Sequence, residues 1–198
     1  MRALVLYAHP LEGSFNAAIR DQVIAQLETA GVETRVNDLY QRKFQACLSP
    51  DELSNYLNCP DNVDVVKSEV EDLQWADTLI FIYPTWWYGL PAILKGWLDR
   101  VLLPDVAFLM PDATNENIRP GLTNIKRIGV FTTCGASRWL TFIVGAPGKR
   151  TLLRGVRFIC AKQCKTAFAA HYLMDSSTPA SREKHLKKVQ RSLAKLIS

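Results

Sequence analysis

Residues 77–89 read Asp77-Thr78-Leu79-Ile80-Phe81-Ile82-Tyr83-Pro84-Thr85-Trp86-Trp87-Tyr88-Gly89, and they are the clearest indication of the fold. Its first half is a continuous apolar run, which is the pattern of a strand buried on both faces of a parallel sheet. The run ends in a loop with three consecutive aromatic residues. Trp and Tyr bring large flat apolar faces with a polar edge, so a strand-end loop of this kind suits a planar ligand.

Similar runs recur along the chain, separated by helical patterns. The predicted strands are 3–7, 32–37, the run quoted above, 126–132, and a fifth that begins at 156–160. The predicted helices start after Ser14, at 62, at 89 and at Thr178-Pro179, and a short helix ends at 152–155. Strands alternating with helices predict one α/β domain over residues 1–198. Right-handed crossovers give a doubly wound, five-stranded parallel sheet of order 2-1-3-4-5 with helices on both faces.

Composition is ordinary for a globular protein, with 48% hydrophobic and 22% charged residues. No apolar run reaches the roughly 18 residues of a membrane span, and the odd count of five cysteines indicates a reducing compartment. Many of the basic residues behind the +5 net charge alternate with apolar ones between 182 and 197, which predicts the solvated face of a last helix. We therefore expect a cytoplasmic protein with no nucleic acid, membrane or metal partner.

Three loops are predicted to meet beyond the carboxyl ends of the strands, where such sheets bind ligands. In the first loop, His9 precedes Ser14, Phe15 and Asn16 at a helix start. Free backbone N–H groups at that start favour an anion such as a phosphate, and the plain alternative is an ordinary helix cap. The first loop alone does not decide between these two.

The second and third loops suit a flavin ring. In the second, one aromatic side chain can stack on the ring while the others support the loop; core packing or a subunit contact is the alternative. In the third, small side chains and N–H groups leave the fourth strand and can stabilise negative charge on the reduced ring. The residues predicted to hold the cofactor here are Pro84, Thr85, Trp86, Trp87, Tyr88, Gly89, Thr132, Thr133, Cys134 and Gly135.

These motifs resemble the NAD(P)H:quinone oxidoreductase family, the DT-diaphorase-like flavoproteins of the flavodoxin-like fold. The resemblance rests on 7–9 with 14–16, on Pro84 with 87–97, and on 132–133 with Gly135, and it extends to about Trp139. It implies a flavin, FAD before FMN, bound by the three loops, with NAD(P)H as cosubstrate. It also implies a homodimer with the active site at its interface, which would cover the apolar helix 90–101.

Several positions depart from the family pattern. Trp86 stands where the best-known members carry Gln, and Cys134 where they carry Gly. Trp139 lies about where their active-site Tyr is, while the partner His has no counterpart near 144–145. The catalytic residues are therefore unknown, with Trp139 and Arg138 as candidates.

The predicted function is a two-electron, ping-pong reductase in which NAD(P)H delivers a hydride to flavin N5 and a quinone or similar acceptor then removes it. Two alternatives remain. One is a flavin-binding, redox-sensing regulatory subunit of a transporter, as some similar proteins are, and the other is a flavodoxin-like electron carrier.

Overall fold

The computed structural model describes residues 1–198, and its centre is a five-stranded parallel sheet. The strands are β1 (Arg2–Tyr7), β2 (Glu33–Asp38), β3 (Thr78–Thr85), β6 (Arg127–Cys134) and β7 (Lys165–His171). Their order in the sheet is β2-β1-β3-β6-β7, which is 2-1-3-4-5 when these strands are counted along the chain. The predicted topology is confirmed. Pro84 on β3 pairs with Thr133 on β6, so the loops that follow these strands leave the sheet side by side.

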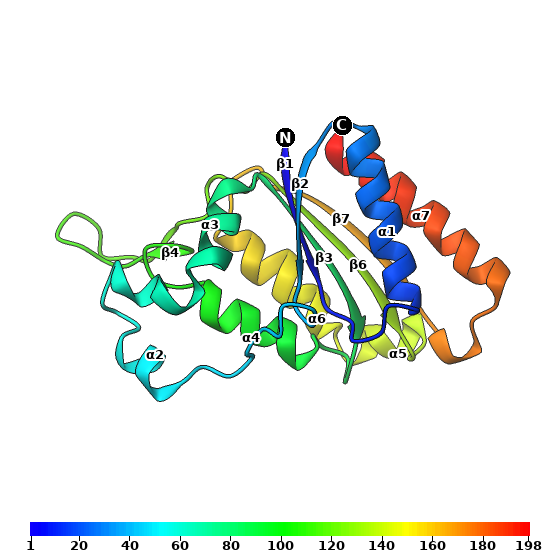
Figure 1. Cartoon of the computed structure of the whole chain (residues 1–198), viewed down its shortest axis with the longest axis horizontal. Helices are drawn as coiled ribbons and strands as arrows, with labels where there is room; N and C mark the ends of the chain where they lie inside the picture. The colour runs from blue at the N-terminus through cyan, green and yellow to red at the C-terminus, as the bar shows by residue number, and fades with distance from the viewer.

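Helices cover both faces of the sheet (Figure 1). One face packs against α1 (Phe15–Thr29) and α7 (Pro179–Ile197), and the other against α3 (Lys67–Trp75), α4 (Ala92–Val101) and the helical segment α6–η2 (Pro147–Arg150 and Thr151–Val156). Along β3, Leu79 and Phe81 belong to one core while Ile80 and Ile82 belong to the other. Burial on both faces explains why the run from 78 to 83 is continuously apolar.

Short elements connect this framework. They are α2 (Pro50–Ser54), η1 (Asp61–Val66), α5 (Arg138–Ile143), η3 (Met174–Ser176) and an antiparallel ribbon of β4 (Phe108–Leu109) and β5 (Arg119–Pro120). The helix predicted from residue 62 is two elements, η1 and α3. None of the helices combines the length and the apolar character that crossing a bilayer requires.

The fifth strand was predicted too early. Residues 151–158 are helical and β7 begins only at Lys165. The run from 156 to 160 alternates like a strand, but its apolar residues also fit a helical turn: Val156 and Cys160 are buried, and the Cys160 thiol lies 3.2 Å from the Val156 carbonyl oxygen. Packing on the sheet therefore prevails over the local strand pattern, and Phe158 is left 78% exposed.

Part of the outer face of α4 is covered by its own chain, so the apolar character of this helix does not by itself require a second subunit. Gly96 lies so close to the segment before α2 that a Cβ there would come within 2.1 Å of the Ala46 carbonyl oxygen. Arg100 donates from Nε to Glu52 at 2.7 Å, and it is 6% exposed. This segment accounts for the burial of Gly96 and Arg100 on α4, and the homodimer stays a prediction.

Candidate functional site

A hollow of about 680 Å³ lies beyond the carboxyl ends of β1, β3 and β6. It is called the carboxyl-edge hollow below. The three loops predicted to meet do meet here, and eleven of the fourteen residues predicted to hold a cofactor line it. These eleven are His9, Ser14, Phe15, Asn16, Pro84, Thr85, Trp86, Trp87, Thr133, Cys134 and Gly135.

The first loop is joined to the third through α1. Ser14 caps α1, because its hydroxyl accepts the Ala17 N–H at 3.1 Å. The Asn16 side chain is buried and donates from Nδ2 to the Thr133 hydroxyl at 2.9 Å, while its Oδ1 has no partner. The first N–H groups of a helix have no intrahelical acceptor and carry a partial positive charge. This wall of the hollow therefore offers both N–H donors and a buried carbonyl acceptor.

His9 adds a further donor to the same wall. Burial lowers the pKa of its imidazole, so the ring is neutral at pH 7. Its Nδ1 accepts the Leu11 N–H at 3.1 Å. In a neutral imidazole with an accepting Nδ1, the proton resides on Nε2. Nε2–H is thus the remaining donor of this side chain.

The aromatic loop turns back on itself at Trp87 and Tyr88, whose φ angles are +47° and +60°. The Gly89 N–H donates to the Trp86 carbonyl at 2.9 Å, closing a four-residue turn. Positive φ at both central residues is the pattern of a type I′ turn. As a result Trp87 is 94% exposed and Trp86 44% exposed at the mouth of the hollow.

Three predicted site residues support the loops without lining the hollow. The Thr132 hydroxyl donates to the Tyr83 carbonyl at 2.7 Å and lies 2.9 Å from the Thr85 hydroxyl. Tyr88 instead lines a small neighbouring space of about 20 Å³ together with Phe168 and Tyr172. Gly89 packs by its backbone against Gly148, where a Cβ would come within 3.1 Å.

Some lining residues were missed by the sequence analysis. Met174 and Asp175 follow β7 and reach the hollow, where the Asp175 carboxylate lies 3.0 Å from the position of a Cβ on Gly135. A fifth strand placed at 165–171 would have brought their loop to this edge, but the predicted strand at 156–160 concealed it. The candidates Arg138 and Trp139 lie on α5 and do not line the hollow; Trp139 is 71% exposed.

Two buried histidines lie behind Phe15. His171 ends β7 and His185 lies on α7, with ring centroids 5.1 Å apart, and the His171 ring is 5.3 Å from that of Phe15. The Nε2 atom of each histidine is without a hydrogen-bond partner. Burial lowers the pKa of His171, and burial with the nearby His171 and Lys188 lowers the pKa of His185 to about 4. Both rings are neutral at pH 7.

The model of a protein family described as "Flavodoxin-like fold" matches residues 1–197. The chain belongs to this family. It is also 30% identical over 205 residues to a protein of Haemophilus influenzae named as an uncharacterized NAD(P)H oxidoreductase, covering 100% of this chain and 98% of the relative. Family membership agrees with the resemblance found in the sequence and with the observed sheet order.

Two further relatives carry quinone in their names. The NAD(P)H dehydrogenase [quinone] 1 of Cavia porcellus is 35% identical over 168 residues, which cover 77% of this chain and 60% of that protein. The solved structure of an NAD(P)H:quinone oxidoreductase from Methanothermobacter marburgensis superposes with a TM-score of 0.82 at 26% identity, covering 100% of this chain and 98% of the other.

Proposed function

We propose that this protein is a flavin-dependent NAD(P)H oxidoreductase that passes a hydride through flavin N5 to a quinone or similar small acceptor. The observation that carries the proposal is the carboxyl-edge hollow, in which an anion-binding helix start faces an aromatic loop at the edge where this fold binds ligands. The names of the relatives support the same activity. A bound flavin would supply the hydride chemistry, and the chain would supply binding and orientation.

The residues present fit a flavin. For its phosphate, α1 offers its first N–H groups, the Ser14 side chain and His9 Nε2–H. For its ring, the hollow offers Trp86 and Pro84 on one side and the third loop on the other. The unpartnered Oδ1 of Asn16 is an acceptor suited to a cofactor N–H. We keep FAD before FMN as the expected cofactor.

Other side chains of the site hold it in shape. Cys134 is 5% exposed and its thiol lies 3.7 Å from the Thr141 hydroxyl, so it acts as a small packed residue and not as a nucleophile. Trp87 extends beyond the hollow and can cover an acceptor that stacks on the ring.

A homodimer with the site at its interface is part of this proposal. Next to the third loop, α5 exposes Trp139, Phe142 and Ile143 by 71%, 78% and 57%. Large apolar side chains grouped on one short helix are typical of a contact surface. A second copy would bury them and close the mouth of the hollow near Trp87.

Purified protein tests the proposal in three measurements. Mass spectrometry of the released cofactor should identify FAD or FMN. Menadione reduction by NADH or NADPH should show ping-pong kinetics with vigorous turnover, which neither a regulatory subunit nor an electron carrier would give. Light scattering at several concentrations should give twice the chain mass. Protein that neither contains nor binds FAD or FMN contradicts the proposal.

A further inference from the structure

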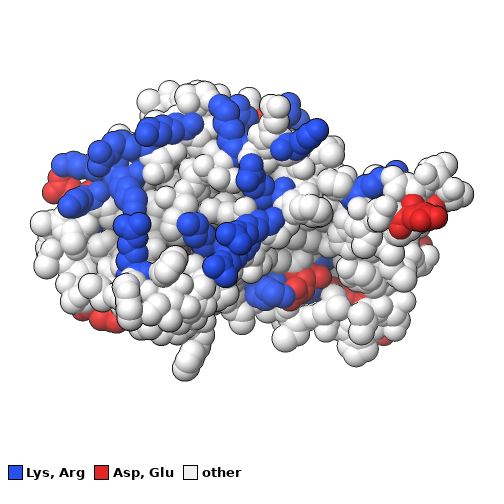
Figure 2. Space-filling view, turned by 180° about the vertical axis from the view of Figure 1, so that it is seen from behind, with Lys and Arg blue, Asp and Glu red and all other residues white.

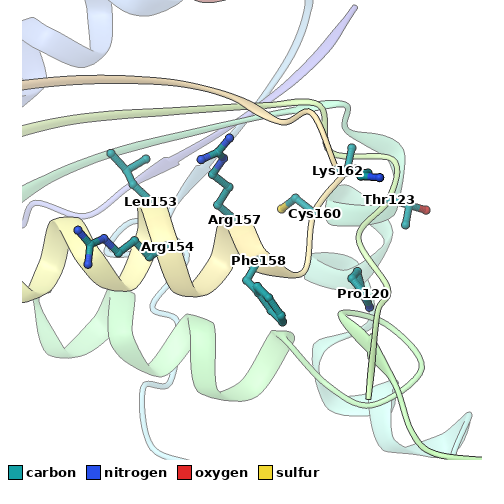
Figure 3. Close-up of a pocket in the computed structure, with 9 residues that line it drawn as sticks. Pro120, Thr123, Leu153, Arg154, Arg157, Phe158, Cys160 and Lys162 are labelled. Carbon is teal, nitrogen blue, oxygen red and sulfur yellow. The ribbon is translucent and has the colours of Figure 1, made fainter. Parts of the chain in front are cut away.

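A second hollow, of about 570 Å³, lies at the opposite end of the sheet. It is called the amino-edge groove below. Its walls come from the end of the η2 helix, the turn before β7, and the connection between β5 and β6 (Figure 3). The residues that line it are Pro120, Thr123, Leu153, Arg154, Arg157, Phe158, Cys160, Ala161 and Lys162.

The amino-edge groove is separate from the proposed flavin site. Its lining residues precede β6 and β7, whereas those of the carboxyl-edge hollow follow β1, β3, β6 and β7. Strand β6 has eight residues and so separates the two ends by about 25 Å. A small molecule in the groove would not touch a flavin in the hollow.

The groove has an uncompensated positive charge. Arg154, Arg157 and Lys162 line it together with no carboxylate. None of the three takes part in the ion pairs of the chain. Figure 2 shows Lys and Arg spread over the back of the molecule with few Asp or Glu between them. Three unpaired cations around one concave surface favour an anionic ligand.

One of these cations is held in place. Arg157 donates from Nε to the Cys164 carbonyl at 3.0 Å, which fixes its guanidinium while the terminal nitrogens stay free. A fixed guanidinium with free paired donors suits a phosphate, because its fork matches two phosphate oxygens. The Cys164 N–H donates to the Ala161 carbonyl and closes a turn that contains Lys162. The backbone N–H of Lys162 itself donates to no backbone oxygen.

The groove also has an exposed aromatic wall. Phe158 is 78% exposed, and its ring projects from the helix toward Pro120 (Figure 3). An aromatic face at this position gains little from folding because water covers it. It can stack on a planar ring, as aromatic side chains do on nucleic acid bases.

We propose that the amino-edge groove is a binding site for a nucleoside phosphate, distinct from the flavin site. Arg157 and Lys162 bind the phosphate, Arg154 adds to the positive field, and the base stacks on Phe158. The volume lies within the range of about 300–1,000 Å³ that small-molecule pockets have. A short open groove with one aromatic wall fits a single nucleotide better than a long polyanion, which would follow an extended patch.

Calorimetric titration of the purified full-length chain tests this site with three probes. ADP should bind, inorganic pyrophosphate should bind more weakly, and adenosine should not bind measurably. The double variant R157E/K162E should weaken ADP binding at least a hundredfold. Phe158→Ser should weaken ADP binding about tenfold and leave pyrophosphate binding unchanged, since only the nucleotide stacks.

The control variant is Lys188→Glu, which reverses an exposed charge on α7 at the other face of the sheet. It should bind ADP like the wild type. Cofactor content and menadione turnover should also be unchanged in every variant, so a failure of this site is distinguishable from a failure of the proposed function. ADP binding that survives R157E/K162E, ADP that competes with NADH, or a single-stranded oligonucleotide that binds more tightly than ADP would overturn the proposal.

Discussion

The two ends of the sheet are built in different ways. At the carboxyl end, the walls of the hollow are joined by a buried hydrogen bond between Asn16 and Thr133 and a partly buried one between Thr85 and Thr132. At the amino end, Arg154 and Lys162 have no ion-pair partner, and Phe158 is 78% exposed. Side chains of the first kind serve the fold and the site together, while those of the second kind are free to serve a ligand alone. Substitutions at the carboxyl end should therefore lower the free energy of unfolding more than substitutions at the amino end.

The largest effect is expected for Asn16→Leu. The change removes a buried hydrogen bond and leaves the Thr133 hydroxyl unsatisfied, so the free energy of unfolding should fall by about 1–3 kcal/mol. The affinity for flavin should fall at least tenfold. Urea unfolding and fluorescence titration measure the two quantities. The matched control is Asn117→Leu, at an exposed position. If both variants lowered stability and flavin affinity equally, the special role of the buried Asn16 side chain would be contradicted.

A second effect depends on pH and is expected only at the carboxyl end. His185 has its pKa lowered to about 4, against 6.5 in the unfolded chain, so the folded state resists its protonation. Above pH 6.5 His185 is neutral in both states and does not lower the free energy of unfolding. As the pH falls from 6.5 toward 4, the unfolded chain takes up a proton that the folded state resists, and the free energy of unfolding falls by at most about 1.4 kcal/mol per pH unit. Unfolding curves at pH 7 and pH 5 should show a smaller difference for His185→Leu than for the wild type. An unchanged difference would contradict the assignment.

A smaller effect should come from the turn of the aromatic loop. Trp87 has a φ of +47° and a side chain that is 94% exposed, so its removal forfeits little packing. Trp87→Gly should be more stable than Trp87→Ala by about 0.5–1 kcal/mol, because only glycine adopts this backbone conformation without strain. Thermal unfolding of the two variants measures the difference. Equal melting temperatures would mean that the turn relaxes on substitution.

The smallest effect is expected at the amino end. Phe158→Ser and Arg154→Gln remove exposed side chains without intramolecular partners, so each should change the free energy of unfolding by less than about 0.5 kcal/mol. Denaturant unfolding compares them with Asn16→Leu. A loss above about 1 kcal/mol for either variant would show that the amino-edge groove also serves the fold.

The carboxyl-edge hollow could be predicted from sequence because its signals are local. A continuous apolar run identifies β3, and the residues that follow a strand in a parallel sheet must emerge at one edge. Ser14 as a helix cap and the aromatic loop after Tyr83 are each visible within a few residues. Once the order of the strands is known, these short signals suffice to place three loops together.

The rest could not be predicted because it depends on packing between distant segments. The pattern from 156 to 160 fits a strand and a helical turn equally, and only contact with the sheet decides between them. The direction of the Thr132 side chain, inward to the Tyr83 carbonyl, follows from the register of β3 and β6. The residues that pack on the outer face of α4 lie some fifty positions earlier in the chain, and no local sequence pattern predicts this contact.

The contact between Gly89 and Gly148 has a consequence for protein engineering. The aromatic loop rests on α6 by main-chain atoms, with no side chain between them. A library that diversifies Trp86 and Trp87 can therefore vary the mouth of the hollow while the backbone contact between Gly89 and Gly148 is kept. Both glycines should be kept fixed in such a library, since any larger residue at position 148 would displace the loop and mix changes of shape with changes of chemistry.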